Sequence, residues 1–284
     1  HALNYTKVKD LLLEDDEVCG VRIEDSEQAK CLELTAPVVI NATGAWADRL
    51  RNKVNKEKRI RPLRGSHIII PKSLYPVTDV MTFLHQDDKR GVYVYPWEGT
   101  TVIGTTDLDH HEDLDIEASI SGEETKYLLD GFNGQFPNNA LTQDHILSTW
   151  AGVRPVIGAE NSKNPSKERR DHAVWVDKGL VTVSGGKLTT FRLIALDALA
   201  AAESKLPSPK EFADDCMFPT PNVSSDSLLP ENTSLAQRLL GRYGEKAKIL
   251  LENSTANERL TIEETEFSLA ECRWAIRNEA VEHL

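Results

Sequence analysis

The sequence predicts a mixed α/β fold (α/β with α+β character), in which a parallel-sheet segment, an antiparallel sheet and carboxyl-terminal helices follow one another. Residues 37–41 contain an unbroken β-branched run, which predicts a strand buried on both faces, as in parallel sheets. Apolar segments separated by turns between residues 61 and 150 predict the antiparallel sheet. Apolar residues at helical spacing after residue 233 predict the helices.

The amino-terminal stretch predicts an antiparallel meander, because apolar runs at residues 8–13, 18–23 and 31–34 are separated by turns. The strand at 37–41 then runs into Ala-Thr-Gly-Ala-Trp at 42–46, which is typical of a strand-to-helix turn. A glycine in such a turn lets a ligand approach the backbone closely.

The next elements are an antiparallel sheet and one helix that covers it. Ser121 and Glu124 form a capping box ahead of apolar residues at helical spacing, so a helix is expected to begin there. Strands are expected at residues 67–70, 81–85, 91–95, 101–104 and 146–150.

A second strand-to-helix turn follows the sheet. Strands at 173–176 and 180–184 lead into Gly185 and Gly186 and then into a helix at about 190–206. Prolines punctuate the chain beyond this helix, which predicts a linker over residues 207–232.

Composition and charge exclude several function classes. The 284 residues are 40% hydrophobic, which suits a globular protein with a sizeable core. The net charge of -12 gives no electrostatic footprint for nucleic acid, so an anionic substrate needs a local basic cluster. No apolar run reaches the roughly 20 residues of a membrane-spanning helix, and no signal peptide opens the chain, so a cytoplasmic protein is expected.

No metal site is expected. His110, His111 and Glu112 are consecutive, and neighbouring side chains of an extended chain point to opposite faces. The four cysteines lack paired C-x-x-C spacing, which argues against zinc and favours a reducing compartment. They are Cys19, Cys31, Cys216 and Cys272.

Six short segments occur in a fixed order along the chain. They are N-A-T-G-A-W at 41–46, R-G-S-H-I-I-I-P at 64–71, V-Y-P-W at 94–97, I-G-T-T-D at 103–107, W-A-G-V-R-P at 150–155 and S-G-G-K-L-T-T-F-R at 184–192. Together these segments resemble the FAD-dependent glycerol-3-phosphate dehydrogenases over roughly residues 1–205. The resemblance implies a partial FAD-binding Rossmann-like domain of the D-amino-acid-oxidase type, an antiparallel β-sheet substrate domain and a carboxyl-terminal helical domain.

The resemblance implies a division into five segments. Residues 1–60 and 151–206 are expected to form parts of the FAD-binding domain, and residues 61–150 the substrate-binding sheet. Residues 207–232 are the linker and residues 233–284 the helical domain. The sequence contains no G-x-G-x-x-G turn to hold a pyrophosphate. We therefore expect a carboxyl-terminal part of the enzyme that binds FAD weakly or not at all.

The resemblance also implies which residues lie near FAD. Val8 faces the adenine, the first glycine turn lies near the cofactor, and the second lies against the isoalloxazine ring and ribityl chain. The residues are Val8, Ala42, Thr43, Gly44, Gly185, Gly186, Lys187, Leu188, Thr189 and Thr190. Independently, two glycines let amides approach a ring, and the helix start after them offers unpaired N–H groups. A plain turn is the alternative for the glycine pair.

Basic residues are expected to hold the substrate. By resemblance, Arg154 contacts the substrate hydroxyl region, and Arg170 binds phosphate with a planar, permanently charged fork. Lys187 is expected near the flavin pyrimidine or the phosphate. The alternatives are a surface ion pair for Arg170 and a solvent-facing side chain for Lys187. His67 and Arg154 are rival candidates for handling the hydroxyl proton, and a packed, non-catalytic role is the alternative for His67.

The reaction implied is oxidation of glycerol 3-phosphate to dihydroxyacetone phosphate, with electrons passed to a quinone. The resemblance implies a peripheral location at the inner face of the cytoplasmic membrane, and a homodimer is left open. An oxygen-using oxidase and an amino-acid oxidase of the same superfamily are alternatives, as is a binding module without catalysis. The phosphate distinguishes them, because an amine substrate would not need Arg154, Arg170 and Lys187 to converge.

Overall fold

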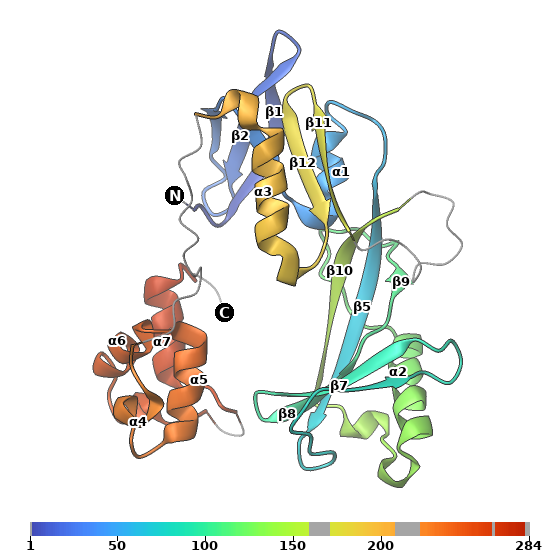
Figure 1. Cartoon of the computed structure of the whole chain (residues 1–284), viewed down its shortest axis with the longest axis vertical. Helices are drawn as coiled ribbons and strands as arrows, with labels where there is room; N and C mark the ends of the chain where they lie inside the picture. The colour runs from blue at the N-terminus through green and yellow to red at the C-terminus, as the bar shows by residue number, and fades with distance from the viewer. Residues whose placement is uncertain (1, 159–170, 208–221, 263–264, 282–284) are drawn as a thin grey trace. The chain divides into compact units, whose positions relative to one another are not determined.

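The computed structural model describes residues 2–158, 171–207, 222–262 and 265–281. The chain divides into two compact units, His1–Pro209 and Lys210–Leu284, and each is described by itself (Figure 1). Within the described ranges, no helix combines the length and the apolar character that crossing a membrane requires.

The first sheet is the expected meander. Leu11 and Val18 are buried on it and pack with Leu180 of a neighbouring sheet, so the meander is joined to the rest of its unit by an apolar cluster. Its strands pair antiparallel in the order β1-β2-β3 and span β1 Thr6–Glu14, β2 Glu17–Asp25 and β3 Cys31–Thr35.

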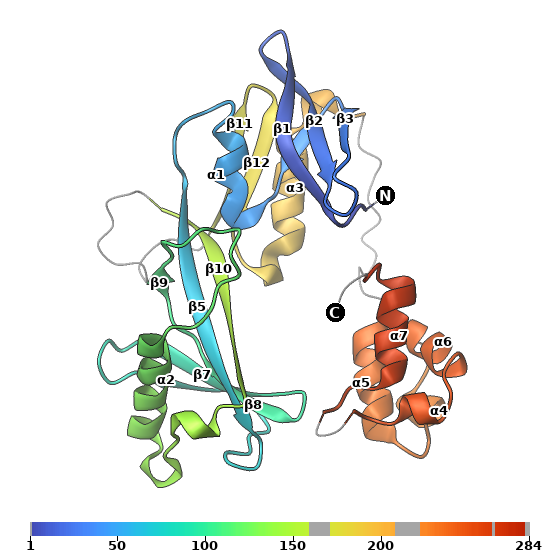
Figure 2. The ribbon, with the colours of Figure 1, turned by 180° about the vertical axis from the view of Figure 1, so that it is seen from behind.

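The second sheet has the order β11-β12-β4 and carries helices on both faces. α1 and α3 lie on opposite faces of it (Figures 1 and 2). β4 pairs parallel with β12, which confirms the parallel strand predicted from residues 37–41. Burial on both faces was wrong for Ile40, which is 41% exposed, because the face of β4 that carries it is only partly covered by the described residues. The elements are β4 Val39–Asn41, α1 Ala47–Arg51, β11 His172–Asp177, β12 Leu180–Gly185 and α3 Phe191–Ala201.

The third sheet is antiparallel throughout and has the order β10-β5-β8-β7-β6, with β9 pairing β5. α2 covers one face of it, and both halves of the capping box at Ser121 and Glu124 are present, as predicted. The elements are β5 Ile60–Pro71, β6 Met81–Leu84, β7 Gly91–Trp97, β8 Thr100–Gly104, β9 Leu108–Asp109, α2 Gly122–Gln135 and β10 Ser148–Ile157.

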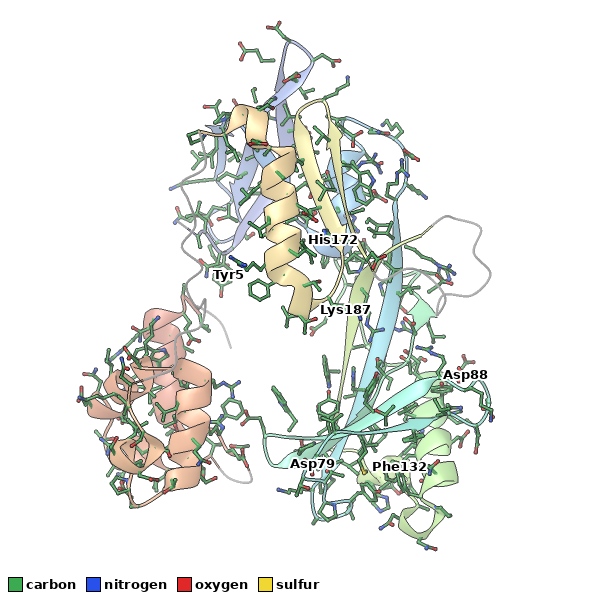
Figure 3. All side chains as sticks on the ribbon, in the orientation of Figure 1. Tyr5, Asp79, Asp88, Phe132, His172 and Lys187 are labelled. Atoms are coloured by element: carbon green, nitrogen blue, oxygen red, sulfur yellow. The ribbon has the colours of Figure 1, made fainter. Side chains whose placement is uncertain are left out.

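The two faces of this antiparallel sheet differ. On β5, Ile68 and Ile70 are fully buried and pack with Leu128 and Phe132 of α2, the latter labelled in Figure 3. Because side chains alternate along a strand, His67, which directly precedes Ile68, belongs to the opposite face, which α2 does not cover. β5 and β10 extend past the other strands toward the second sheet (Figure 2). The face of the third sheet that α2 leaves uncovered therefore extends to the carboxyl end of β12.

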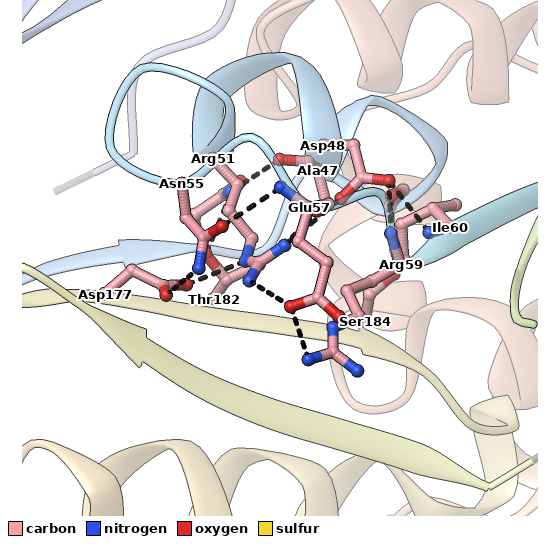
Figure 4. A network of polar contacts seen from close by, with 12 residues as sticks. Ala47, Asp48, Arg51, Asn55, Glu57, Arg59, Ile60, Asp177, Thr182 and Ser184 are labelled. Atoms are coloured by element: carbon pink, nitrogen blue, oxygen red, sulfur yellow. Dashed lines mark hydrogen bonds and ion pairs between the residues drawn. The ribbon is translucent and has the colours of Figure 1, made fainter. Parts of the chain in front are cut away.

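A buried arginine anchors α1 to the second sheet (Figure 4). The Arg51 side chain is 2% exposed, and its Nε donates to Asp177 Oδ2 at 2.7 Å. Asn55 donates to the other oxygen of the same carboxylate at 2.6 Å. Asp48 accepts from the backbone N–H groups of Arg59 and Ile60, each at 2.8 Å. These bonds fix α1 against β11 and against the start of β5.

The second unit is a small helical bundle. Ala236, Leu239 and Leu250 form its core together with Leu229, which lies within the predicted linker. The linker prediction is therefore corrected for residues 222–232, where Ser224 caps a short helix; the division into five segments otherwise stays a prediction. The helices are α4 Ser225–Leu228, α5 Thr233–Tyr243, α6 Lys246–Glu252 and α7 Leu269–Asn278.

Short 3-10 helices connect several of these elements. In the first unit they are η1 Gly44–Trp46, η2 Pro137–Asn139, η3 Gln143–His145, η5 Leu188–Thr190 and η6 Glu203–Lys205. In the second unit, η7 Asn257–Arg259 precedes α7. Two of them, η1 and η5, directly follow β4 and β12, so both strands of the parallel pair end in tight turns.

Candidate functional site

The two glycine turns lie beside each other at one edge of the second sheet. β4 and β12 run parallel, so their carboxyl ends meet at the same edge. Ser184 Oγ donates to Gly44 O at 3.4 Å, which links the turns directly. Asn41 is buried and shapes the first turn, since it donates to Ala47 O at 2.9 Å and accepts from Thr43 Oγ1 at 2.7 Å. The fold thus brings together residues 42–44 and 185–186.

The backbone at this edge requires glycine. Gly44, Gly185 and Gly186 have φ angles of 61°, 82° and 79°, a region that L side chains rarely adopt. A Cβ on Gly185 would lie 2.7 Å from Asp171 O, and a Cβ on Gly186 would lie 2.6 Å from Ile194 Cδ1. Conformation disfavours larger residues at all three positions, and a backbone oxygen excludes them at Gly185, which is compatible with close ligand approach and also with a tight turn.

The residues that follow the glycine pair are exposed. Lys187, Leu188, Thr189 and Thr190 form the turn between β12 and α3, where Figure 3 labels Lys187. Thr190 Oγ1 accepts from the Lys187 N–H at 3.3 Å and donates to Lys187 O at 2.9 Å, so the turn is closed locally. These side chains are therefore accessible to a ligand at the sheet edge.

A cavity of about 630 Å³ lies between β1 and α1. Val8 and Thr43 both line it, although they come from different sheets. Trp46 forms part of its wall and donates to Asp115 Oδ1 at 3.0 Å. The basic residues that line it are Lys7, Lys9, Arg49 and Lys53. Each of these cations is paired with a carboxylate, so the apolar wall is the feature that suits a planar ligand.

Arg154 lies flat on β5 and is held by a turn. A Cβ on Gly65 would lie 2.2 Å from Arg154 Nη2, so only glycine leaves room for the guanidinium. Nη2 donates to Thr105 Oγ1 at 2.9 Å, and Nη1 lies 3.3 Å from Asp107 Oδ1. The Arg154 side chain is 36% exposed. It is thus fixed in direction while part of its surface stays accessible.

A smaller cavity of about 130 Å³ joins Arg154 to the glycine pair. Gly185 and Gly186 line one side of it, and Arg154 and Asp107 line another. Lys187 is not among the residues that line it, and Arg170 lies outside the described residues. The structure therefore brings Arg154 to the second glycine turn, whereas the expected convergence of Arg154, Arg170 and Lys187 stays a prediction.

His67 is held between aromatic rings on the uncovered face of the sheet. Its ring stacks on Trp150 with a centroid distance of 4.2 Å and an interplanar angle of 10°. Tyr95 meets it edge-on at 6.5 Å. A Cβ on Gly104 would lie 2.2 Å from His67 Cδ2, so the ring fills the space above that glycine. Its Nδ1 is buried and has no hydrogen-bond partner within the described part of the chain.

The environment of His67 favours the neutral imidazole. Burial, and to a smaller extent the nearby Arg154 charge, together lower the pKa of His67 to about 4. At neutral pH the ring therefore has a nitrogen available to accept a proton. Burial also raises the pKa of Tyr95, which stays a protonated phenol.

Trp150 and Tyr95 were not predicted as site residues, although both lie in the segments singled out from the sequence. Trp150 and Arg154 are four residues apart on β10, so strand alternation places them on one face. That spacing could have identified Trp150. Tyr95 lies on β7 and Gly65 on β5, and their relation to His67 and Arg154 depends on strand order, which local spacing does not contain.

Comparisons with known proteins agree on one family. A family model described as FAD dependent oxidoreductase matches residues 1–196. The aerobic glycerol-3-phosphate dehydrogenase of Bacillus subtilis (strain 168) is 38% identical over 196 residues, which are 68% of this chain and 35% of that protein. The enzyme of the same name from Staphylococcus haemolyticus (strain JCSC1435) is 35% identical over 208 residues, 72% of this chain and 37% of that protein.

A solved structure shows the same likeness. The glycerol-3-phosphate dehydrogenase from Bacillus halodurans, complexed with FAD, matches with a TM-score of 0.72 and 27% identity. The match covers 88% of this chain and 51% of that one. The chain thus spans about a third of the length of the curated relatives, 35% and 37%, and half of the solved one.

Proposed function

Since this chain belongs to the FAD-dependent oxidoreductase family, we propose that it carries the substrate side of an enzyme that oxidises sn-glycerol 3-phosphate to dihydroxyacetone phosphate. The observation that carries the proposal is the cavity that Arg154 shares with Gly185 and Gly186. A fixed cation beside a turn open to a flat ligand suits a polar substrate next to a flavin ring. The names of the relatives support glycerol 3-phosphate as the substrate.

We assign FAD to two places that its chemistry fits. The large cavity, with Val8 and Thr43 in its wall, suits the adenine end of the dinucleotide. The turn at Gly185 and Gly186 suits the isoalloxazine ring, since glycines, which its positive φ angles favour, place no side chain in the way. Residues Ala42, Gly44, Lys187, Leu188, Thr189 and Thr190 complete the proposed contacts.

When bound, FAD supplies the acceptor for the hydride that leaves C2 of the substrate. His67 is proposed to accept the proton of the C2 hydroxyl, because its imidazole is neutral at neutral pH; burial beside Arg154 makes it a weaker base than a free imidazole. Arg154 is always protonated, so it suits stabilising the negative charge that develops on that oxygen rather than accepting the proton. The electron pair of the C–H bond and the hydroxyl proton thus leave by separate routes.

The phosphate of the substrate is assigned to Arg170 and Lys187. Arg170→Ala should weaken turnover of glycerol 3-phosphate far more than turnover of glycerol, because only the former carries a dianion. The expected loss is on the order of 2 to 4 kcal/mol of transition-state stabilisation. Equal losses with both substrates would remove Arg170 from the phosphate site.

Electrons are proposed to pass from the reduced cofactor to a quinone, at the inner face of the cytoplasmic membrane. The sequence lacks the long insertion expected between Arg154 and Arg170 in oxygen-using oxidases of this type, which favours the dehydrogenase. A homodimer is compatible with this assignment. Reoxidation by a quinone analogue and by oxygen, compared in one stopped-flow experiment, separates the two acceptors. Rapid peroxide formation would identify the oxidase.

The 284-residue polypeptide by itself is proposed to be inactive. It contains no G-x-G-x-x-G turn, so the pyrophosphate of FAD lacks the amides that usually hold it. The purified polypeptide should be colourless. A yellow preparation with stoichiometric FAD would contradict this and would mean that another copy or chain supplies the missing contacts.

The central test is flavin reduction by glycerol 3-phosphate in a flavin-loaded protein that contains residues 1–284. Bleaching of the flavin absorbance within one turnover, and its loss in Arg154→Ala, are the expected results. Glycine and D-amino acids serve as competing substrates. Reduction by an amino acid but not by glycerol 3-phosphate would assign the site to an amino-acid oxidase instead.

A further inference from the structure

Glu124 is a buried carboxylate at the amino terminus of α2, outside the site described above. It is 1% exposed. Its Oε1 accepts from Thr106 Oγ1 at 2.6 Å and from Ser66 Oγ at 2.8 Å. Its Oε2 accepts from the Ser121 N–H at 2.9 Å and lies 2.9 Å from Arg64 Nη2. A single carboxylate therefore joins α2 to β5 and to the turn after β8.

These contacts keep the carboxylate charged. Burial by itself raises the pKa of Glu124, but the hydrogen bonds from Thr106, Ser121 and Ser66, with the Arg64 charge, outweigh it and lower the pKa below its usual value. Burying an unpaired carboxylate would be costly, so the donors and the charge belong together.

The helix cap explains only part of this arrangement. A capping box needs one bond from the Glu124 side chain to the Ser121 N–H, and an exposed glutamate can make it. The other oxygen is directed at Thr106 and Ser66 of the sheet. Thr106 Oγ1 in turn accepts from the Ser66 N–H at 2.9 Å, so the turn is attached to β5 through the same hydroxyl.

The turn that Glu124 fixes is the one that holds Arg154. Arg154 donates to Thr105 Oγ1 at 2.9 Å and to Thr106 O at 3.3 Å, and it pairs with Asp107 Oδ1 at 3.3 Å. These three partners lie within residues 105–107, and Thr106 contacts both Glu124 and Arg154. A shift of this turn would move these three partners of the guanidinium at once.

We propose that Glu124 is a positioning residue, which sets the direction of the Arg154 guanidinium through the turn at residues 105–107. The inference rests on the proposed function, in which Arg154 meets the reacting oxygen of glycerol 3-phosphate. Glu124 touches neither substrate nor cofactor. It acts through this turn and through its contacts to Ser66 and Arg64, which flank Gly65 beneath the guanidinium.

Glu124→Gln tests the inference with little change of shape. Whichever way the carboxamide turns, its NH2 group faces groups that now donate to Glu124: either the Thr106 and Ser66 hydroxyls or the Ser121 N–H and Arg64. The turn should shift, and kcat/KM for glycerol 3-phosphate should fall on the order of 10- to 100-fold, mainly through kcat. Glu123→Gln is the matched control. Glu123 is exposed in the same helical turn, and its substitution removes the same charge without touching the turn at residues 105–107.

A double variant separates positioning from general destabilisation. In an Arg154→Ala background, Glu124→Gln should lower kcat/KM by no more than about twofold, because residues that act as a unit are not additive. Its effect on thermal unfolding should be unchanged in that background. The inference would be overturned if the losses in kcat/KM of the two single variants multiplied in the double variant. It would also be overturned if Glu124→Gln kept wild-type rates. If Glu124→Gln fails to fold, Thr106→Val and Thr106→Ser serve in its place, and only the former should lose activity.

Failure of the proposed function has a different signature. A wild-type protein that does not oxidise glycerol 3-phosphate would refute that function while leaving the link from Glu124 to Arg154 open to a structural test. A crystal structure of Glu124→Gln should then show Arg154 displaced from Thr105 and Asp107. Unchanged bonds at both partners would overturn the positioning role without any activity measurement.

Discussion

Arg51 and Arg154 are both paired with an aspartate, yet they lie in regions of different character. Arg51, the last residue of α1, is 2% exposed and its Nε lies 2.7 Å from Asp177 (Figure 4). Arg154, on the uncovered face of the antiparallel sheet, is 36% exposed and its Nη1 lies 3.3 Å from Asp107. An ion pair therefore does not distinguish a structural arginine from a functional one. Access to a cavity distinguishes them, because only an accessible charge can meet a ligand.

The two regions also differ in what their contacts accomplish. The bonds of Arg51, including one to Glu57 O, connect α1 to β11 and to the segment before β5, and its guanidinium lies 5.6 Å from the Trp175 ring. The bonds of Arg154 to residues 105–107 end on one short turn, which Glu124 contacts through Thr106. Removing Arg51 should loosen a packed layer, whereas removing Arg154 should change a surface that a substrate can reach.

The largest effect is expected from Arg51→Ala. It leaves Asp177 partly buried beside a cavity, so the free energy of unfolding should fall by about 3 to 5 kcal/mol. Urea unfolding of the first unit measures this. Arg22→Ala is the control, because Arg22 forms an exposed ion pair with Glu33 and should cost about 1 kcal/mol or less. Equal losses in the two variants would contradict the contrast.

Arg154→Ala should affect activity far more than stability, which is the opposite of the result expected for Arg51→Ala. It should lower kcat/KM for glycerol 3-phosphate about 100- to 1000-fold, roughly 2.7 to 4 kcal/mol, because a fixed charge beside the developing oxyanion is lost. The free energy of unfolding should change far less than in Arg51→Ala. Steady-state kinetics and urea unfolding of the same preparations test both halves. If the Arg154→Ala protein were unstable but had normal kinetics, Arg154 would be a structural arginine like Arg51.

Gly65→Ala sharpens the comparison, because it displaces Arg154 without removing its charge. The new Cβ would lie 2.2 Å from Arg154 Nη2, the far end of a side chain that can move aside. The expected result is a fall in kcat/KM on the order of 10-fold with a small change in stability. Gly91→Ala is the control, since its Cβ would meet only Thr82 Cγ2 at 3.5 Å. Kinetic losses of equal size in both variants would refute the steric argument.

The smallest effect concerns pH. The pKa of His67 falls from 6.5 in the unfolded chain to about 4 in the folded protein, so between these values only the unfolded chain binds the proton. Stability contributed by the neutral ring is present above pH 6.5 and is lost as the pH falls toward 4. His67→Phe keeps an aromatic ring over Trp150 and should show a weaker pH dependence of unfolding in this window. An identical slope would mean that His67 has an ordinary pKa.

The sequence by itself determined the local elements of the first unit. The capping box at Ser121 and Glu124, the parallel character of residues 37–41 and the turn at Gly185 and Gly186 could be predicted, because each depends on neighbouring residues. The ordered segments also predicted the family, which the comparisons confirm. The prolines before residue 233 misled the linker prediction, because Ser224 caps a helix there and Leu229 finds a core to pack in.

Only the tertiary structure decided which residues meet. Arg154 and Thr105 are 49 residues apart in sequence and bond because β10 pairs β5, which in turn pairs β8. The same pairing stacks His67 on Trp150 and directs the second oxygen of a predicted capping glutamate into the sheet. Spacing along the chain reports on contacts within a few residues, whereas strand order and register depend on burying whole faces. The site residues could therefore be nominated from the sequence, but their partners could not.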